Sequence, residues 1–557
     1  MPIRAVTSAV LLLVAGSLGC GRERATRPDL PIRAVTDARL DSAAADAWLS
    51  YGRDRGNTRY VPLTEINHGT VGSLRKLWQH KPGTLLRRHM RNESTPIVVD
   101  GMLIYTDINN LVMAVDVRSG EEQWRYKPDL GPAALCCGTV NRGVAVYGDK
   151  VYLASLDARV IALDRRTGKV VWDLKAATTS EGYSFTMAPL AADGKIIVGS
   201  SGGEFGARGF VDAYDPATGQ RLWRFWTVPG PAEGGWYGQW SSTTPDGEPL
   251  PRDIAREKRD SAKYAEAWRR GGAGMYSTPA YDAQRGLIIA ATGNPSAVDG
   301  VIPSGDNLYS TSLVAIDVRT GKLQWYYQVL PHNLWDFDNA NPPVLIDVPV
   351  GDSTLPLVGA AGKTGWLYLL DRRTGRQVRR SDAFIPLENI FPTPTREGVR
   401  TSPGTRGGAN WAPPAYSPRT GLFYVLGSYA PMMFTSDSAT GDRPGPERFK
   451  GARFTALPDS VSYGTLSAID VRTGAIRWQA RTPRNGLVGG VLATEGDLVF
   501  YSDIQGYLNA LDAATGRTLW RDRAGKSPLS PPISFQVDGH QHLAVCSWQG
   551  LAMYGLQ

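Results

Sequence analysis

The chain has four cysteines, and two of them are placed where redox chemistry is possible. Cys136 and Cys137 are adjacent. Their Cα atoms are ~3.8 Å apart across a trans peptide, whereas ordinary disulfides join Cα atoms ~4.4–6.8 Å apart. A bond between them would close a rare, strained ring, and two buried free thiols are the alternative. Cys546 lies in an apolar run and is expected to be a buried strand thiol. The sequence contains neither a CxxCH haem motif nor the paired CxxC motifs of a structural zinc site.

Two further motifs contain acidic side chains, one among small residues and the other in a segment expected to be extended. Residues 201–206 read SGGEFG. Such small residues let backbone N–H groups approach an anionic group closely, as in a phosphate-cradling loop, although an ordinary turn would explain the same letters. Residues 331–338 read PHNLWDFD. Alternation along an extended segment would point Asp336 and Asp338 to the same side. The alternative for Asp338 is a solvated position at the rim of the fold.

The elements that position these motifs are indicated by an internal repeat, A-x-D-x-x-T/S-G-x-x-x-W. Complete copies are centred on six aspartates: Asp116, Asp164, Asp215, Asp317, Asp470 and Asp512. A degenerate copy has Asp371 and Gly375, but Arg379 stands where tryptophan is expected. Each copy predicts a hairpin in which one strand ends at the aspartate, a T-G turn reverses the chain, and a second strand carries the tryptophan. We expect the repeated tryptophans to dock between neighbouring units.

The repeat predicts an all-β fold, an eight-bladed β-propeller over residues 46–557. A strand pair upstream of each hairpin, such as 96–99 with 103–105, gives four strands per blade. The two longest spacings between repeat aspartates, 102 and 99 residues, predict insertions inside single blades near 230–272 and 429–460. Strands within 534–545 and 551–554 would join one at 74–78 in the last blade. That union of the chain ends would close the ring and remove a free sheet edge.

Composition and charge narrow the class of protein. With 42% hydrophobic and 20% charged residues, the chain is globular rather than disordered. Its net charge of +8 is a mild bias over 557 residues. This does not suggest nucleic-acid binding, which usually requires a clustered basic face, and it is compatible with an acidic protein partner.

The first residues predict export. Arg4 precedes an apolar run that is too short to span a bilayer, for which ~20 residues are needed, so residues 1–19 are expected to be a signal peptide. Cys20 follows Ser17-Leu18-Gly19, which resembles a bacterial lipobox even though an aliphatic residue usually stands at Ser17. We expect Cys20 to be lipidated, residues 20–45 to be a tether, and the protein to be a periplasmic lipoprotein. The alternative is an ordinary cleaved signal.

Together these features make the chain resemble the pyrroloquinoline quinone (PQQ)-dependent alcohol dehydrogenases, which are eight-bladed quinoproteins. The resemblance covers about residues 45–557. It implies that Cys136 and Cys137 form a disulfide whose ring lies flat against PQQ. It also implies that Arg142 pairs with a PQQ carboxylate. The full set of implied PQQ contacts is Glu93, Cys136, Cys137, Arg142, Thr186, Ser201, Gly202, Gly203, Tyr276, Lys363 and Asn410.

The same resemblance implies a metal site, with ligands Glu204, Asn294 and Asp336, and Asp338 as an added carboxylate. All-oxygen donors suit Ca²⁺. Relatives with Asp at the position of Asp338 include lanthanide-dependent enzymes, but some calcium or magnesium glucose dehydrogenases also carry the W-D-x-D pattern. Asp336 is the implied base for the substrate hydroxyl, and Lys363 stabilises the oxyanion that develops as hydride passes to PQQ. The implied substrate is a primary or secondary alcohol, or a polyol or sugar. Electrons would leave to a cytochrome c.

Three positions depart from the family pattern. Gly274 and Tyr276 stand where the family usually has threonine and tryptophan, and Val488 stands where alcohol dehydrogenases usually have tryptophan. A quinoprotein homologue that has lost PQQ is therefore one alternative. Another is a non-catalytic propeller lipoprotein of the outer-membrane assembly type, which would need the repeats and the lipobox but not the site motifs.

Overall fold

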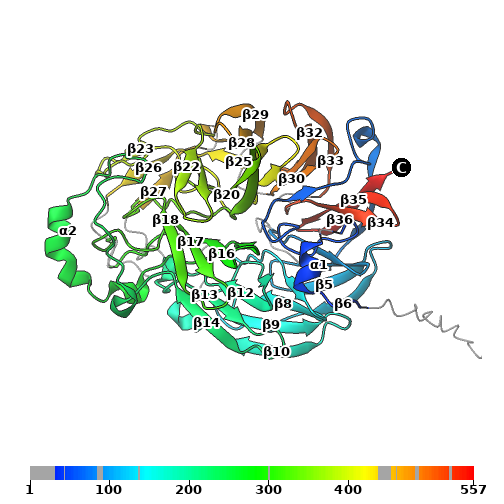
Figure 1. Ribbon diagram of the computed structural model, residues 1–557, viewed down its shortest axis with the longest axis horizontal. Coiled ribbons are helices and arrows are strands. Elements are labelled where there is room, and N and C mark those ends of the chain that lie inside the picture. The colour runs from blue at the N-terminus through cyan, green and yellow to red at the C-terminus, as the bar shows by residue number, and fades with distance from the viewer. Residues whose placement is uncertain are drawn as a thin grey trace, which may run out of the picture.

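The computed structural model describes residues 32–436 and 453–557, apart from 43, 84–91, 134, 136–137, 299–300, 459–460, 483–488 and 526–529. Strands dominate, and the main sheets are arranged around a common centre as the blades of a propeller (Figure 1). No helix in the described ranges is long and apolar enough to cross a membrane.

Each blade is an antiparallel sheet of four strands that follow one another in the sequence. Blade 1 contains β3 (Ile97–Val99), β4 (Met102–Thr106), β5 (Val112–Asp116) and β6 (Glu122–Tyr126). Blade 2 contains β7 (Ala145–Tyr147), β8 (Lys150–Ala154), β9 (Arg159–Asp164) and β10 (Val170–Lys175). Blade 3 contains β11 (Leu190–Ala192), β12 (Lys195–Gly199), β13 (Phe210–Tyr214) and β14 (Arg221–Trp226). Blade 4 contains β15 (Ala280–Asp282), β16 (Leu287–Ala291), β17 (Ser312–Asp317) and β18 (Leu323–Gln328).

The second half of the ring repeats this plan. Blade 5 contains β19 (Val344–Val350), β20 (Ser353–Ala361), β21 (Leu367–Asp371) and β22 (Gln377–Arg380). Blade 6 contains β24 (Ala415–Ser417), β25 (Leu422–Tyr429), β28 (Tyr463–Asp470) and β29 (Ile476–Thr482). Blade 7 contains β30 (Val491–Thr494), β31 (Leu498–Ser502), β32 (Tyr507–Asp512) and β33 (Thr518–Arg523), with β1 (Tyr60–Val61) added in parallel to β30.

Blade 8 closes the ring from both ends of the chain, as predicted. It contains β34 (Ile533–Val537), β35 (His540–Ser547), β36 (Gly550–Leu556) and β2 (Leu74–His80). Strand β36 lies in the middle of this sheet, because it pairs with β35 on one side and with the N-terminal β2 on the other. The ring is therefore held shut by the hydrogen bonds of an ordinary antiparallel ladder.

The repeat residues form one interlocking device between blades. In blade 1, the Asp116 carboxylate accepts the N–H groups of Arg118 and Ser119 at 3.0 and 2.9 Å, which closes the turn. Gly120 follows with φ +70°, where a side chain is strained. A Cβ atom there would also lie 2.6 Å from Cε3 of Trp78, so the preceding blade's tryptophan packs on this glycine. Both the backbone conformation and the ring therefore require glycine.

The same docking recurs around the ring. The other tryptophan–glycine pairs are Trp124 on Gly168, Trp172 on Gly219, Trp223 on Gly321, Trp325 on Gly375 and Trp478 on Gly516. The indole N–H usually donates to a backbone carbonyl of the next blade, as Trp325 does to Arg372 at 3.0 Å. In the degenerate copy Arg379 takes this place against Gly474 and donates to Thr473 O at 3.3 Å. The prediction that the tryptophans dock between blades is confirmed.

One predicted insertion lies inside a blade and the other does not. Residues 429–460 separate β25 from β28 within blade 6 and add β26 (Met432–Thr435) and β27 (Arg453–Ala456), which form a small sheet with β23 (Val399–Thr401). Residues 230–272, in contrast, lie between β14 of blade 3 and β15 of blade 4. Their helices are η4 (Pro231–Glu233), α2 (Ile254–Asp260), η5 (Ser261–Tyr264) and η6 (Ala267–Arg270), and α2 projects from the ring (Figure 1).

The predicted tether also differs from the structure where the chain is described. Within residues 32–42 lies helix α1 (Asp37–Asp41), and its Leu40 is buried. Val35 pairs with Gly148 of blade 2 through two backbone hydrogen bonds of 2.7 and 2.9 Å. This part of residues 20–45 is therefore docked on the propeller. The remaining 3₁₀ segments are η1 (Val71–Ser73), η2 (Thr179–Glu181) and η3 (Gly203–Phe205).

The meander within each blade divides its loops between two faces. The T-G turns, between the third and fourth strands, lie on one face together with the turns between the first and second strands. The opposite face carries the inter-blade loops, each leading into the first strand of a blade, and the loops between second and third strands. We call this the loop face.

Candidate functional site

The described residues of the predicted site all lie on the loop face. Those in inter-blade loops are Glu93, Arg142, Thr186, Tyr276, Asp336, Asp338 and Asn410. Those in loops between second and third strands are Ser201, Gly202, Gly203, Glu204, Asn294 and Lys363. The predicted cysteine pair, Cys136 and Cys137, and the predicted lipidation site, Cys20, lie outside the described residues.

One group of site residues is centred on the Arg142 guanidinium. Arg142 and Glu93 form an ion pair at 2.7 Å, and their side chains are 5% and 4% exposed. Arg142 also donates to Thr186 Oγ1 and to Tyr276 O, both at 2.9 Å. Thr186 Oγ1 in turn lies 2.9 Å from Ser201 Oγ. The residues predicted to contact PQQ from blades 1, 2 and 3 thus form one continuous polar chain.

A second group contains the predicted base and its charged neighbours. The Lys363 ammonium is ion-paired with Asp338 Oδ2, lies 3.5 Å from Asp336 Oδ2, and donates to Asp336 O at 2.9 Å. The Lys363 and Asp338 side chains are only 5% and 10% exposed, whereas that of Asp336 is 29% exposed. Asp338 is therefore a buried member of the site, not a solvated residue at the rim.

Asn294 joins the two aspartates. Its backbone N–H donates to Asp338 Oδ1 at 2.8 Å, and its side-chain N–H donates to Asp336 Oδ1. Asp336 is held with φ +58°, a conformation that costs free energy and is found disproportionately at functional sites. The Asp336 carboxylate is thus fixed between an amide and an ammonium group.

Asn333 is a member of this group that sequence reasoning missed. Its side-chain N–H groups donate to Asn294 Oδ1 at 2.7 Å and to Thr311 Oγ1 at 2.9 Å, and its Oδ1 accepts the N–H of Trp335 at 2.9 Å. It therefore orients the Asn294 amide and shapes the loop that carries Asp336. Its place inside the motif at 331–338 was the available signal, but nothing in the motif distinguished it from a loop residue.

Tyr276 lies between the two groups. The Arg142 guanidinium is 5.8 Å from its ring centroid, and a Cβ atom at Gly293 would lie 3.1 Å from its Cε1. Burial raises the pKa of Tyr276 well above its usual value, and the negative charges of Asp338, Glu204 and Asp336 raise it further. The phenol therefore stays neutral. Glu204 therefore lies close enough to act on the Tyr276 phenol.

The departure at Gly274 has a steric reason in this fold. A Cβ atom at Gly274 would lie 2.6 Å from Ser200 O, too close for any side chain. The segment that carries Tyr276 therefore runs closer to the end of β12 than a threonine at this position would permit.

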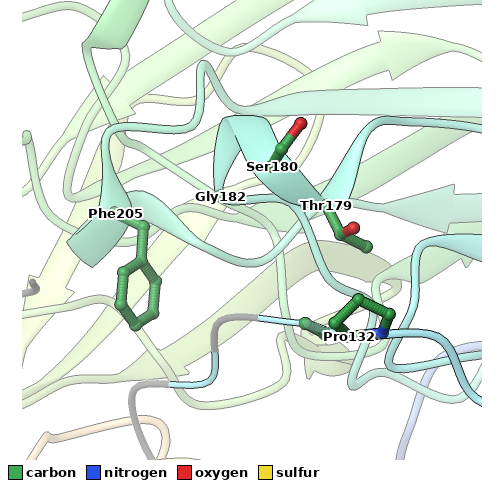
Figure 2. Close-up of a pocket in the computed structure, with 6 residues that line it drawn as sticks. Pro132, Thr179, Ser180, Gly182 and Phe205 are labelled. Carbon is green, nitrogen blue, oxygen red and sulfur yellow. The ribbon is translucent and has the colours of Figure 1, made fainter.

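Glu204 lies in η3, between Gly202 and Gly206, which have φ +109° and +76°. Beside it is a pocket of about 530 Å³ lined by Pro132, Ala133, Thr179, Ser180, Gly182 and Phe205. Figure 2 shows the Phe205 ring on one side of the pocket and Pro132 and Thr179 on the other. Because Phe205 directly follows Glu204, this pocket lies next to one of the predicted metal ligands.

The first group fits an anionic, planar cofactor such as PQQ. Arg142 is buried with its Nε lacking a hydrogen-bond partner among the described residues. The rings of Tyr276 and Trp411 lie 5.8 and 5.7 Å from its guanidinium carbon. A buried cation flanked by aromatic rings can bind an aromatic carboxylate through charge and stacking. The Oδ1 of Asn410 accepts the backbone N–H of Trp411 at 2.8 Å. Among the described residues, the side-chain N–H groups of Asn410 are therefore available to a ligand.

The second group fits a hard cation in the chemistry of its donors. Asp336, Asp338 and Asn294 offer carboxylate and amide oxygens, the ligands that Ca²⁺ takes. Within the described ranges, no three His, Cys, Asp or Glu side chains are gathered closely enough to form a metal cluster. Asn294, Asp336 and Asp338 are brought together, and Glu204 is linked to them through its electrostatic effect on Tyr276.

Comparison with known proteins identifies one family over most of the propeller. Residues 48–382 and 376–543 match the PQQ family described as the glucose/ethanol/alcohol dehydrogenase β-propeller domain. The chain is 34% identical over 519 residues to quinoprotein alcohol dehydrogenase PedH of Pseudomonas putida, covering 88% of this chain and 84% of that protein. It is also 34% identical over 562 residues to a quinoprotein ethanol dehydrogenase of Pseudomonas aeruginosa, covering 93% and 88%.

Solved structures agree with this assignment. A europium-containing methanol dehydrogenase superposes with a TM-score of 0.78 at 30% identity, covering 92% of this chain and 91% of that one. The quinohemoprotein alcohol dehydrogenase of Comamonas testosteroni gives a TM-score of 0.79 at 30% identity, with coverages of 93% and 82%.

Proposed function

Because this chain belongs to the PQQ-dependent glucose, ethanol and alcohol dehydrogenase family, we propose that it is a PQQ- and metal-dependent dehydrogenase that oxidises an alcohol. The observation that carries the proposal is the group of Asp336, Asp338, Asn294 and Lys363 on the loop face, in which the Lys363–Asp338 ion pair is buried. A buried ammonium–carboxylate pair is costly to desolvate and is weak evidence for stability. A non-catalytic scaffold would have no use for it, whereas a dehydrogenase needs a fixed base and a fixed cation.

Asp336 is the base in this proposal. Of the two aspartates beside Lys363, only Asp336 presents substantial surface, with 29% of its side chain exposed against 10% for Asp338. Asn294 and Lys363 hold its carboxylate in one orientation, so that an oxygen can take the proton of a substrate hydroxyl without first reorganising. Lys363 then remains as the cation that stabilises negative charge nearby.

Arg142, Thr186, Ser201, Tyr276, Lys363 and Asn410 would hold PQQ, and Glu204, Asn294, Asp336 and Asp338 would hold Ca²⁺ or a lanthanide ion. When bound, PQQ supplies the two-electron acceptor and the ion supplies Lewis acidity. Arg142 is paired with Glu93 in the structure, so these two residues would meet the cofactor as a preformed unit. Tyr276, neutral and buried, would provide an aromatic face.

The finer features of the proposal rest on sequence motifs and on the names of relatives. The substrate would be a primary or secondary alcohol, with a polyol or sugar as the alternative. A cytochrome c would accept the electrons, since the sequence has no haem motif. The predicted signal peptide at residues 1–19 and the lipobox-like sequence before Cys20 support export to the periplasm and a lipid anchor.

Reconstitution tests the function directly. Purified protein would be mixed with PQQ and either Ca²⁺ or a light lanthanide, and its visible absorption spectrum recorded. Reduction of an artificial dye would then be followed with a panel of alcohols, polyols and sugars. We expect a PQQ spectrum that changes on binding and dye reduction with at least one alcohol. No spectral change and no turnover would indicate a homologue that has lost PQQ.

A further inference from the structure

Residues 44–61 lie outside the four-stranded repeats of the blades but hydrogen-bond to the first strands of several. We call residues 44–61 the axial segment, because first strands are the innermost strands of a propeller. Its backbone bonds are Trp48 with Val98 of blade 1, Arg55 with Tyr281 of blade 4, Gly56 with Leu345 of blade 5, Thr58 with Tyr416 of blade 6 and Arg59 with Ala493 of blade 7. These bonds are 2.7–3.0 Å long.

Asn57 of this segment contacts two of the inter-blade loops on the loop face. Its side-chain N–H groups donate to Thr278 O at 3.2 Å and to Pro343 O at 3.1 Å. Thr278 follows Tyr276 by two residues, and Pro343 follows Asp338 by five. One fully buried amide therefore ties together the inter-blade loops that carry the aromatic residue and the acidic residues of the site.

Arg59 does the same for two other blades. Its guanidinium donates to Val491 O at 2.8 Å, to Pro532 O at 2.6 Å and to Tyr51 O at 2.9 Å. Val491 is the first residue of β30 in blade 7, and Pro532 immediately precedes β34 in blade 8. Arg59 is fully buried, and burial lowers its pKa to about 10. Within the described residues it forms no ion pair with a carboxylate; its polar partners are these three carbonyls, and the Trp48 ring lies 5.2 Å from its guanidinium carbon.

The backbone of the segment is adapted to deliver these two side chains. Asn57 and Arg59 have φ +61° and +48°, a region that non-glycine residues seldom occupy. Gly52 packs against Asn57, and a Cβ atom there would lie 2.9 Å from Asn57 Cβ. Strained backbone persists where the surrounding structure holds it in place, and it is concentrated at functional sites. Here the result is a set of donors directed at carbonyls at or just before the starts of four first strands.

We propose that Asn57 and Arg59 are positioning residues of the dehydrogenase site. Asn57 sets the spacing between the inter-blade loops that lead into blades 4 and 5, and thereby the spacing between Tyr276 and the Asp336–Asp338 group. Arg59 sets the spacing between the starts of blades 7 and 8. The hydrogen bonds of the axial segment would thus affect how tightly the site binds PQQ. The effect on PQQ affinity rests on the proposed function, whereas the effect on loop positions concerns the protein without cofactor.

The test compares Asn57→Gly with Tyr60→Phe. Glycine keeps the positive φ and removes the donor. Tyr60→Phe removes a hydrogen bond that the same segment makes to Glu495, which lies in the turn between β30 and β31. Hydrogen–deuterium exchange of the apoprotein should be at least tenfold faster in peptides 272–282 and 338–346 of Asn57→Gly, and unchanged in peptide 102–116. The PQQ dissociation constant, titrated with Ca²⁺ present, should rise at least tenfold. Tyr60→Phe should stay within twofold of wild type in both measurements.

Arg59→Lys provides a second variant, because lysine keeps the charge and loses the three-carbonyl geometry. It should accelerate exchange in peptides that cover 489–494 and 530–537. Wild-type exchange and PQQ affinity in both variants would overturn the proposal, and so would uniform acceleration across all peptides. Faster loop exchange with unchanged PQQ affinity would overturn the link to the site. If wild-type protein bound no PQQ, the proposed function would fail, and the exchange data would still decide whether these residues position the loops.

Discussion

Asp336 and Asp338 share a single ammonium group, that of Lys363, and they share it unequally. Asp338 is buried and has partners at both carboxylate oxygens, namely Lys363 and the N–H of Asn294. Asp336 is more exposed and more distant from Lys363. Asp336 thus presents the more accessible of the two carboxylates.

The first prediction follows for Asp336. Asp336→Ala should lower dye-linked turnover by a factor of about 10²–10⁴, the usual contribution of a general base. The melting temperature should change little, because stability comes from contacts between blades. Activity would be measured with saturating PQQ and metal. Retention of more than a tenth of wild-type activity would show that Asp336 is not the general base.

A second prediction concerns the metal and Asp338. An added carboxylate favours a trivalent ion more than a divalent one, because the Coulomb energy scales with the product of charges. We expect a light lanthanide to support activity, and Asp338→Ala to weaken lanthanide-supported activity more than Ca²⁺-supported activity. Equal losses with both ions would mean that Asp338 acts by holding Lys363 and Asn294. No loss with either would exclude both roles.

A third prediction concerns the thiols. Cys546 is fully buried on β35 and unpaired with any described cysteine, and burial raises the pKa of its thiol, so it should resist alkylation in the folded protein. Cys136 and Cys137 should be bonded to each other. Mass mapping without reduction would then find their peptide two hydrogens lighter than the dithiol form. Two alkylatable thiols in that peptide would contradict the disulfide and the role inferred for it.

Among the structural elements, the docking of a tryptophan on the glycine of the next blade provides a matched comparison. Trp325 on Gly375 represents the complete repeat, and Arg379 on Gly474 represents the degenerate one. Trp325 is 8% exposed and donates to Arg372 O at 3.0 Å. Arg379 is more exposed and offers a longer hydrogen bond.

The fourth prediction uses this pair. Trp325→Ala should lower the free energy of unfolding by about 3–5 kcal/mol, as for other buried aromatic residues. Arg379→Ala should lower it by less than about 1 kcal/mol, because little buried surface is lost. Urea denaturation followed by tryptophan fluorescence would measure both. Similar losses at the two positions would show that the arginine docks as strongly as the indole.

The repeat explains why so much of the propeller could be predicted from the sequence, and also where prediction failed. Spacing between repeat aspartates reports only the distance from one T-G turn to the next. It could not reveal that residues 230–272 precede blade 4 while 429–460 lie inside blade 6. Residues 32–61 carry no repeat at all, so neither α1 nor the hydrogen bonds of Asn57 could be anticipated. Asn333 was missed because its role depends on partners from other loops.

For the molecule as a whole, closure depends on β36, which lies between β35 and the N-terminal β2. The fifth prediction is that deletion of residues 550–557 abolishes soluble, compact protein, because it removes a central strand and exposes two edges. Removal of Gln557 alone, which lies outside β36, should have no effect. Size-exclusion chromatography and near-ultraviolet circular dichroism would distinguish the outcomes. A compact monomer with the wild-type melting temperature would contradict this account of closure.

The separation of the two faces has a consequence for how such a protein can diverge. The turns that lock each blade to the next lie on one face, and the loops that carry the charged site residues lie on the other. Selection for durability and selection for a new substrate therefore act on largely separate sets of positions. A laboratory library that randomises the pocket residues Thr179, Ser180 and Phe205, and keeps every T-G turn and docked indole, would explore specificity while the contacts between blades stay unchanged.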